Sequence, residues 1–164
     1  MKGGGRLSFS NDVKNELSRL ETNEVCCDKA EVLGVLRMSG AIVIRGMNIG
    51  IHFSTENAAL ARRVLQILKN NYQVQTEVVI TRSRRLKKNN RYQVRVLPAP
   101  QVSIAMNELQ LLSMESDLKN PLLNKQCCKR AFLRGAFLGG GSISRPSSDY
   151  HLEMVTGNED FARS

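Results

Sequence analysis

The four cysteines are the side chains of this sequence with the widest chemistry, and they come as two adjacent pairs, Cys26–Cys27 and Cys127–Cys128. Thiolates bind zinc or exchange disulfides, commonly from C-x-x-C spacing or from scattered half-cystines. Neither arrangement is present. Adjacent residues of a helix point about 100° apart and make poor joint ligands. Both pairs lie where a helix buries small apolar groups, so the sequence predicts structural cysteines and neither a metal site nor a cofactor.

The two histidines, His52 and His151, are further candidate zinc ligands. Zinc needs three or four protein ligands, and no cysteine or pair of carboxylates accompanies either histidine. We therefore expect both on the polar face of strands. The triplet Gly139-Gly140-Gly141 is followed by no G-K-[ST] and ends a predicted helix, so it does not predict a phosphate-binding loop. No catalytic residue and no small-molecule substrate is predicted.

Basic residues are concentrated in one stretch. Lys and Arg number 24 against 15 Asp and Glu, a net charge of +9. No acid occurs between Glu77 and Glu108, and that interval holds seven bases: Arg82, Arg84, Arg85, Lys87, Lys88, Arg91 and Arg95. The rest of the chain, with 17 basic and 15 acidic residues, is nearly neutral. A localised basic stretch is typical of a protein that binds a polyanion, although it also occurs on a merely solvated hairpin.

The elements that position these residues come in two copies. Shifting the sequence by 101 positions superimposes Cys26 on Cys127, and the register continues without a gap to the end of the chain, with ten of 38 pairs identical. A repeat of this length indicates one structural unit used twice. Glycine inside a helix costs about 1 kcal/mol relative to alanine, so a glycine at the same point in both copies indicates close helix packing. We predict that the two helices pack across a pseudo-two-fold axis through small residues: Ala30, Gly34, Ala131 and Gly135.

Periodicity predicts an α+β fold. The expected elements are a helix capped by Ser10, a helix over 25–38, a hairpin over 42–53, a helix capped by Thr55 over 56–71, and strands over 74–82 and 91–97. Pro98 and Pro100 are predicted to end the sheet before a helix over 101–112. In the second copy, a hairpin is expected from segments 142–144 and 150–156, with Thr156 and Glu159 as a capping box for the next helix.

The expected division of the chain has four parts. Residues 1–20 form a flexible leader, over 1–6, and the N-terminal helix; 21–100 form the first repeat, 101–126 a linker with a helix, and 127–164 the start of the second repeat. The second copy stops before its helix body and second hairpin, so we interpret the chain as a piece of a longer protein.

Composition favours a soluble globular protein. Hydrophobic residues make up 41% of the chain, and charged residues 24%. No apolar run approaches the roughly 20 residues of a membrane span, and Met1–Ser10 lacks the apolar segment of a signal peptide. The sequence predicts a cytoplasmic protein without a membrane partner.

Two levels of resemblance follow from these motifs. The duplicated helix and hairpin resemble the LAGLIDADG homing endonuclease fold, in which two helices form the central interface and two sheets form a saddle over DNA. More specifically, the chain from about Leu7 onward resembles the bacterial WhiA family through five segments: S-F-S-N-D-V-K-N-E-L, T-E-N-A-A-L-A-R-R, L-K-K-N-N-R-Y-Q-V-R, C-C-K-R-A-F-L-R-G-A-F-L-G-G-G-S and Y-H-L-E. This resemblance implies a regulator of cell division, chromosome segregation or sporulation, with a C-terminal helix-turn-helix domain that the present sequence does not contain.

The resemblance also identifies where cleavage chemistry would lie. Cutting enzymes of this fold carry an acid at the eighth position of each helix motif, and the two acids hold divalent metal ions over the scissile phosphates. Here these positions are Ser39 and Gly140. Neither offers the carboxylate that Mg²⁺ requires, so we predict no nuclease activity.

Two functional hypotheses remain. In the first, the chain is a non-catalytic, nucleoid-associated protein that binds double-stranded DNA, and that also contacts other transcription or division proteins. Its predicted DNA-binding residues are the seven bases above together with Arg45, whose strand is expected beside that of Arg91 and Arg95. In the second, the chain is an interaction module that holds a partner or its own helix-turn-helix domain and has little DNA affinity.

Overall fold

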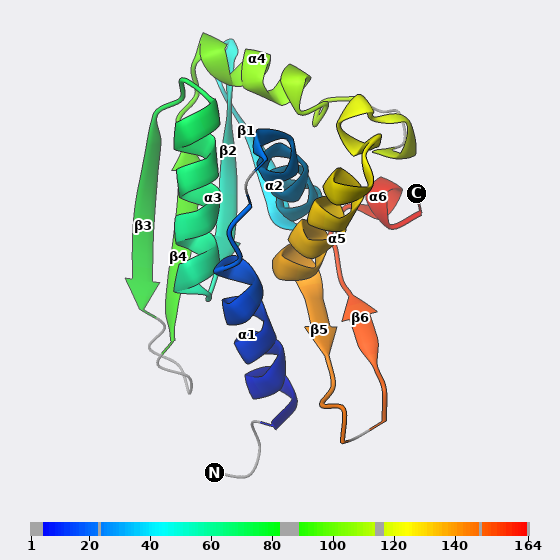
Figure 1. The fold of residues 1–164 in the computed structure, drawn as a ribbon. Helices are drawn as coiled ribbons and strands as arrows, with labels where there is room; N and C mark the ends of the chain where they lie inside the picture. The colour runs from blue at the N-terminus through cyan, green and yellow to red at the C-terminus, as the bar shows by residue number, and fades with distance from the viewer. Residues whose placement is uncertain (1–4, 23, 83–88, 114–116, 148, 164) are drawn as a thin grey trace.

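The computed structural model describes residues 5–22, 24–82, 89–113, 117–147 and 149–163. It has an α+β fold (Figure 1), as predicted. The first part of the chain contains α1 (Gly5–Ser18), α2 (Val25–Ser39), β1 (Gly40–Arg45), β2 (Asn48–Thr55), α3 (Ala58–Asn71), β3 (Thr76–Arg82) and β4 (Asn90–Val96). The second contains α4 (Pro100–Glu108), two short 3-10 turns (Asp117–Lys119 and Pro121–Leu123), α5 (Gln126–Gly140), β5 (Gly141–Ile143), β6 (Leu152–Met154) and α6 (Glu159–Arg163).

The duplication seen in the sequence is present in the bounds of the elements. Helix α2 begins at Val25 and α5 at Gln126, and each runs for 15 residues into a strand that starts at a glycine, Gly40 or Gly141. The following hairpins and helices keep the offset of 101, because α3 begins at position 58 and α6 at position 159. The two copies therefore share one backbone plan as far as the second copy extends.

The strands of the first copy form a four-stranded antiparallel sheet. Its order is β1-β2-β4-β3, so the second hairpin joins the first through β4 (Figure 1). Alternate residues of β2 and β4 point into the core, and Ile51, Phe53, Val94 and Val96 are each at most 3% exposed. Because side chains alternate along a strand, the intervening residues lie on the opposite surface of the sheet, here called the outer face.

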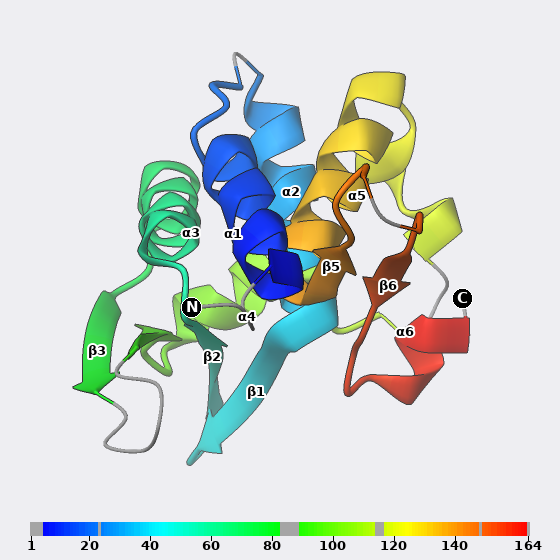
Figure 2. The ribbon, with the colours of Figure 1, turned by 90° about the horizontal axis from the view of Figure 1, so that it is seen from below.

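The core lies between this sheet and the helices. Leu33 of α2, Leu60 and Leu68 of α3, and Met106 of α4 are almost completely buried in one cluster with the inward residues of the sheet. Helices α2 and α3 lie over the core side of the sheet, and α5 packs along α2 away from it (Figure 2). None of the described helices is long and apolar enough to cross a membrane.

Several predicted helix ends are wrong by a residue or more. Ser10 does not cap a helix: α1 already begins at Gly5, within the predicted leader, and the buried Ser10 hydroxyl bonds the backbone of Ile143 in the second copy. Pro100 does not merely end the sheet, because it opens α4, where its fixed φ suits the first helical position.

The caps of α3 and α6 also differ from prediction. Asn57, not Thr55, caps α3 by accepting from the amide of Leu60, and Asn158 caps α6 in the same way. Thr55 and Thr156 instead accept from the amides of these two asparagines. An asparagine at the N-cap satisfies an orphan donor of the first turn, which explains why the same T-x-N motif occurs in both copies.

Candidate functional site

The outer face of the sheet carries most of the predicted DNA-binding residues that the structure describes. Strand register places His52 opposite Arg95, with Ala41 and Glu77 in the same row, and it places Arg45 and Arg91 on this surface as well. Arg45 and Arg91 are exposed, and Arg95 is half-buried. These three arginines thus share one surface that no described helix of the core covers.

Arg82 lies at the end of β3 and is exposed. It pairs in register with Asn90, so it lies on the same face of the sheet as the core residues. The core does not extend this far along β3, and the side chain is therefore not covered. Arg82 therefore extends the basic surface around the edge of the sheet. The remaining predicted contacts, Arg84, Arg85, Lys87 and Lys88, lie outside the described residues.

The predicted position of Arg45 beside β4 is wrong. The strand order separates β1 from β4 by β2, and Arg45 pairs with Asn48 at the turn of the first hairpin. Arg91 pairs with Thr81 near the other end of the sheet. The arginines of the outer face are consequently spread along a diagonal of the sheet and do not form one cluster.

Arg95 has a compensating acid, contrary to the inference from the acid-free interval. Its guanidinium lies 3.4 Å from a carboxylate oxygen of Glu77 on β3, and it donates to the side chain of Gln93 at 2.6 Å. Glu77 closes the acid-free interval in the sequence, but pairing of the strands brings it directly opposite Arg95. Within the described residues, no ion pair is found for Arg45, Arg82 or Arg91, so these three hold the uncompensated charge.

The two positions that carry acids in cutting enzymes lie at the C-terminal ends of α2 and α5. The Ser39 hydroxyl donates to the carbonyl of Val35 at 3.2 Å, in its own helix. Gly140 packs so closely that an added Cβ would meet the carbonyl of Val155 and the side chain of Met38. In the part of the chain that the structure describes, no group of three or more acids or histidines lies near enough together to hold a metal ion.

The contact between α2 and α5 runs the length of both helices (Figure 2). Ala30 and Ala131 are at most 1% exposed. Gly34 and Gly135 permit the close approach: a Cβ on either would collide with the backbone of the partner helix, at the carbonyl of Phe132 or of Glu31. Only a residue without a side chain fits such a contact without moving one helix.

A buried ion triad crosses this contact, and the sequence did not predict it. Glu31 of α2 is 1% exposed, and its two carboxylate oxygens accept from Arg63 of α3 and Arg134 of α5, each at 2.5 Å. Arg63 also donates to the backbone carbonyls of Ser18 and Leu20. One carboxylate thus joins both copies and the end of α1. The signal was available, since Glu31 interrupts an apolar helix segment where the second copy has Phe132.

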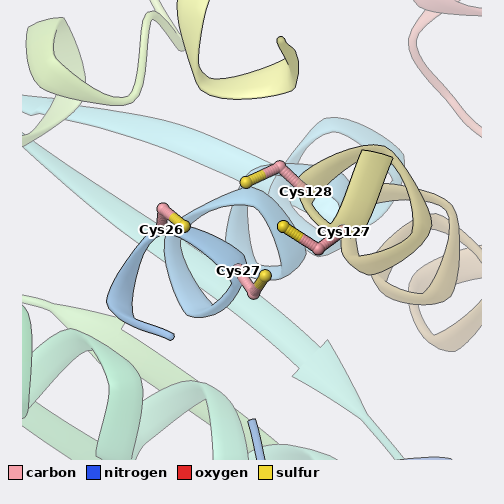
Figure 3. Close-up of side chains that lie close together, drawn as sticks. All are labelled: Cys26, Cys27, Cys127 and Cys128. Carbon is pink, nitrogen blue, oxygen red and sulfur yellow. The ribbon is translucent and has the colours of Figure 1, made fainter. Parts of the chain in front are cut away.

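The four cysteines meet at the N-terminal end of the same helix pair. All four Sγ atoms lie within 4.8 Å of one another. Figure 3 shows the two pairs facing each other from the first turns of α2 and α5. The prediction of burial holds for Cys27 and Cys128, but it is wrong for Cys127, which is exposed, and for Cys26, which is half-buried.

The thiols differ in acidity. Burial raises the pKa of Cys27 to about 11 and that of Cys128 to about 12. The pKa of Cys127 is lowered, chiefly by a hydrogen bond with Cys27. The exposed Cys127 therefore ionises more readily than the buried Cys27 and Cys128.

The fold and the helix pair define the class of protein. A duplicated unit of helix and antiparallel hairpin, joined by close-packed helices that end near each other, is the LAGLIDADG homing-endonuclease-like arrangement. Residues 25–112 match the model of the WhiA N-terminal LAGLIDADG-like domain, and residues 129–164 match that of the WhiA LAGLIDADG-like domain. The chain belongs to the WhiA family.

Curated relatives agree with this assignment. The chain is 40% identical over 164 residues to the probable cell division protein WhiA of Alkaliphilus metalliredigens, covering 95% of this chain and 52% of that protein. It is 42% identical over 155 residues to the protein of the same name from Bacillus cytotoxicus, covering 92% and 48%. The chain thus spans about half the length of the curated relatives it matches.

Solved structures show the same fold. The crystal structure of the N-terminal LAGLIDADG domain of DUF199/WhiA superimposes with a TM-score of 0.64 at 25% identity, over 89% of this chain and 65% of that one. Full-length DUF199/WhiA from Thermatoga maritima gives a TM-score of 0.61 at 22% identity, over 89% of this chain and 44% of that one.

Proposed function

We propose that the chain is a non-catalytic domain that binds double-stranded DNA along the outer face of its sheet. The observation that carries the proposal is the uncompensated charge of Arg45, Arg82 and Arg91 on a surface outside the helical core. Phosphates release counterions when such arginines bind them, which supplies affinity without sequence specificity. The bases Arg84, Arg85, Lys87 and Lys88 of the joining segment add to the same local charge.

We infer that this domain does not cut DNA. A metal ion that activates water over a phosphate needs carboxylate ligands, and the two helix ends offer a hydroxyl, Ser39, and a bare backbone, Gly140. The Ser39 hydroxyl is already bonded within its own helix. Glu31, the nearest acid of α2, is held by Arg63 and Arg134, so its oxygens are not available to a metal ion.

The names of the relatives suggest the cellular role. They are called probable cell division proteins. From this we propose that the chain acts in the cytoplasm, on the nucleoid. We propose that the chain is part of a regulator of transcription linked to cell division, chromosome segregation or sporulation. Other transcription or division proteins are its expected protein partners.

A second candidate function is an interaction module. It is favoured by apolar side chains exposed on the first hairpin, where Ile42 is 50%, Ile44 74% and Met47 100% exposed. Such a surface suits a protein partner, including another domain of the same polypeptide. In this alternative the arginines of the outer face serve solubility and not binding.

The salt dependence of DNA affinity separates the two functions. Three phosphate contacts alone give a slope of log affinity against log salt of about −2.7. We expect the chain to bind a duplex of mixed sequence at low salt with a slope at least this steep. Absence of affinity at low salt would favour the interaction module. Supercoiled plasmid incubated with the chain and Mg²⁺ should stay intact, and nicking that copurifies with the chain would refute the non-catalytic assignment.

A further inference from the structure

The cysteine cluster is the one group of potential metal ligands in the described part of the chain. Each helix contributes two adjacent thiols from its first turn, and the two pairs occupy equivalent positions of the repeat. The adjacent thiols of one helix diverge by about 100°, which is why either pair alone is a poor chelate. The partner helix lies between these two directions, however, so each pair reaches toward it with both side chains (Figure 3).

The helix contact holds these thiols together independently of any ligand. One turn further along, Ala30 and Ala131 are buried in a small cluster with Cys27, Cys128 and Leu123. The glycine contacts of the next turn keep the helix axes close. The first turns are thus fixed by packing on the rest of the interface, and the cysteines need only rotate their side chains to converge on one point.

The distances favour one metal ion of the zinc type. Zinc–sulfur bonds of about 2.3 Å place the sulfurs of a tetrahedron about 3.8 Å apart. The observed upper limit of 4.8 Å needs a contraction of about 1 Å, within the reach of rotamer adjustments. An iron–sulfur cluster would instead need the sulfurs to spread, since an inorganic core lies between its thiolates. Hard cations such as Mg²⁺ prefer oxygen ligands, which this cluster does not supply.

The surroundings suit a site with excess negative charge. Four thiolates around one Zn²⁺ carry a net charge of −2, and the cysteines lie in the first turns of α2 and α5, where the helix dipoles are positive. Lys125 lies close enough to Cys127 to favour its thiolate. The carboxylate of Glu24 opposes this charge and accepts the S–H of Cys26 at 3.6 Å, a proton that the metal would replace. The exposure of Cys127 gives an entering ion a path from solvent.

We propose that Cys26, Cys27, Cys127 and Cys128 form a tetrahedral zinc site that fastens the N-terminal ends of the two repeat helices. The site is distinct from the helix ends at Ser39 and Gly140 and does not depend on DNA binding. Its role is structural, because protein ligands fill all four coordination positions of the metal ion and join the first copy to the second.

Titration with Zn²⁺ tests the proposal. The chain is purified under reducing conditions, freed of metal by a chelator, and titrated against a chromophoric competitor. We expect one Zn²⁺ per chain, a rise in the midpoint of thermal unfolding with Zn²⁺, and protection of all four thiols from alkylation. Co²⁺ in place of Zn²⁺ should give the visible d–d bands of tetrahedral coordination and the charge-transfer absorption of several thiolates.

Two double variants locate the metal. The Cys26→Ser/Cys127→Ser variant removes the more exposed thiols, so the fold should persist by circular dichroism. Its affinity for Zn²⁺ should fall more than about 100-fold, which exceeds the effect of losing an outer-shell partner of a metal ligand. The matched control, His52→Ser/His151→Ser, removes both histidines of the chain. It should keep the stoichiometry and affinity of the unmodified chain.

Three results would overturn the zinc site. The first is absence of stoichiometric Zn²⁺ binding by the reduced, folded chain. The second is binding that survives the double cysteine variant or is lost in the histidine control. The third is another use of the same cysteines in protein purified without oxygen. This would be either an iron–sulfur chromophore, or disulfides between the helices that persist under a reductant sufficient for exposed disulfides.

Discussion

The contact between α2 and α5 and the outer face of the sheet differ in how far the two copies of the repeat still agree. At the helix contact the copies are identical at the decisive positions, Ala30 with Ala131 and Gly34 with Gly135. On the outer face they have diverged, since Arg45 corresponds to Pro146 and His52 to Glu153. Sequence identity between the copies has been kept where their helices pack against each other and lost on the surface that faces solvent. The fold therefore depends on the first region, and the proposed function on the second.

The largest effect on stability is expected from the buried ion triad. Replacing Glu31 with Ala leaves the largely buried side chains of Arg63 and Arg134, which are 12% and 18% exposed, without their acid. Breaking a buried pair in this way costs about 3–5 kcal/mol in the free energy of unfolding. Urea denaturation followed by circular dichroism measures the loss.

The ion pair on the outer face supplies the control for this variant. The Glu77 carboxylate is about half exposed, so Glu77→Ala should cost less than about 1 kcal/mol. Equal losses for Glu31→Ala and Glu77→Ala would contradict the assignment of the structural role to the helix contact.

A smaller but still large effect is expected from Gly135→Ala. Its Cβ would collide with the carbonyl of Glu31, a backbone atom that cannot rotate away, so the two helices must separate. Overpacking of this kind costs about 1–3 kcal/mol in the free energy of unfolding. Gly157→Ala is the matched control, because nothing lies within 4 Å of its added Cβ, and it should change stability by less than about 0.5 kcal/mol. A neutral Gly135→Ala would show that the helices do not pack as closely as described.

The helix caps allow the two copies to be compared directly. Asn57 is 7% exposed, caps a helix whose Leu60 is in the core, and also bonds Asn15, so Asn57→Ala should cost about 1–2 kcal/mol in unfolding. Asn158 makes the same cap on an exposed, five-residue helix, and Asn158→Ala should cost less than about 0.5 kcal/mol. Similar losses in thermal or urea unfolding would mean that the second copy is as tightly packed as the first.

The repeat was the part of the fold that the sequence revealed best. Identical residues at an offset of 101, including Gly34 and Gly135, predicted two helices and their hairpins because a shared register requires a shared backbone. Helix ends were less predictable. Thr55 and Asn57 are both good cap residues, and only the backbone shows that the asparagine takes the cap while the threonine supports it.

Contacts between distant segments account for the rest. The position of Arg45 depends on strand order, which is set by how the second hairpin docks on the first and has no local sequence signal. The partner of Arg95 is Glu77, a cross-strand neighbour 18 positions away. The cysteine cluster cannot be inferred from either pair on its own helix. It follows only from the repeat, which places Cys26–Cys27 and Cys127–Cys128 at equivalent points of two contacting helices.

The outer face, together with Arg82 at the adjoining edge of the sheet, should contribute least to stability and most to DNA binding. Replacing Arg45, Arg82 and Arg91 with Gln removes three exposed charges that have no ion pair among the described residues. The change in the free energy of unfolding should stay within about 0.5 kcal/mol per site. The matched control is the triple variant Arg62→Gln/Lys69→Gln/Lys119→Gln, which removes the same charge from exposed positions away from the sheet.

The slope of log DNA affinity against log salt for these two triple variants is the most direct test of the account. The Arg45/Arg82/Arg91 variant should lose about 2.7 from the magnitude of the slope of the unmodified chain and bind more weakly at every salt concentration, whereas the control should lose less than one contact's share, about 0.9. Equal slopes for the two variants, or an unchanged slope for the Arg45/Arg82/Arg91 variant, would contradict the assignment of DNA binding to this basic surface.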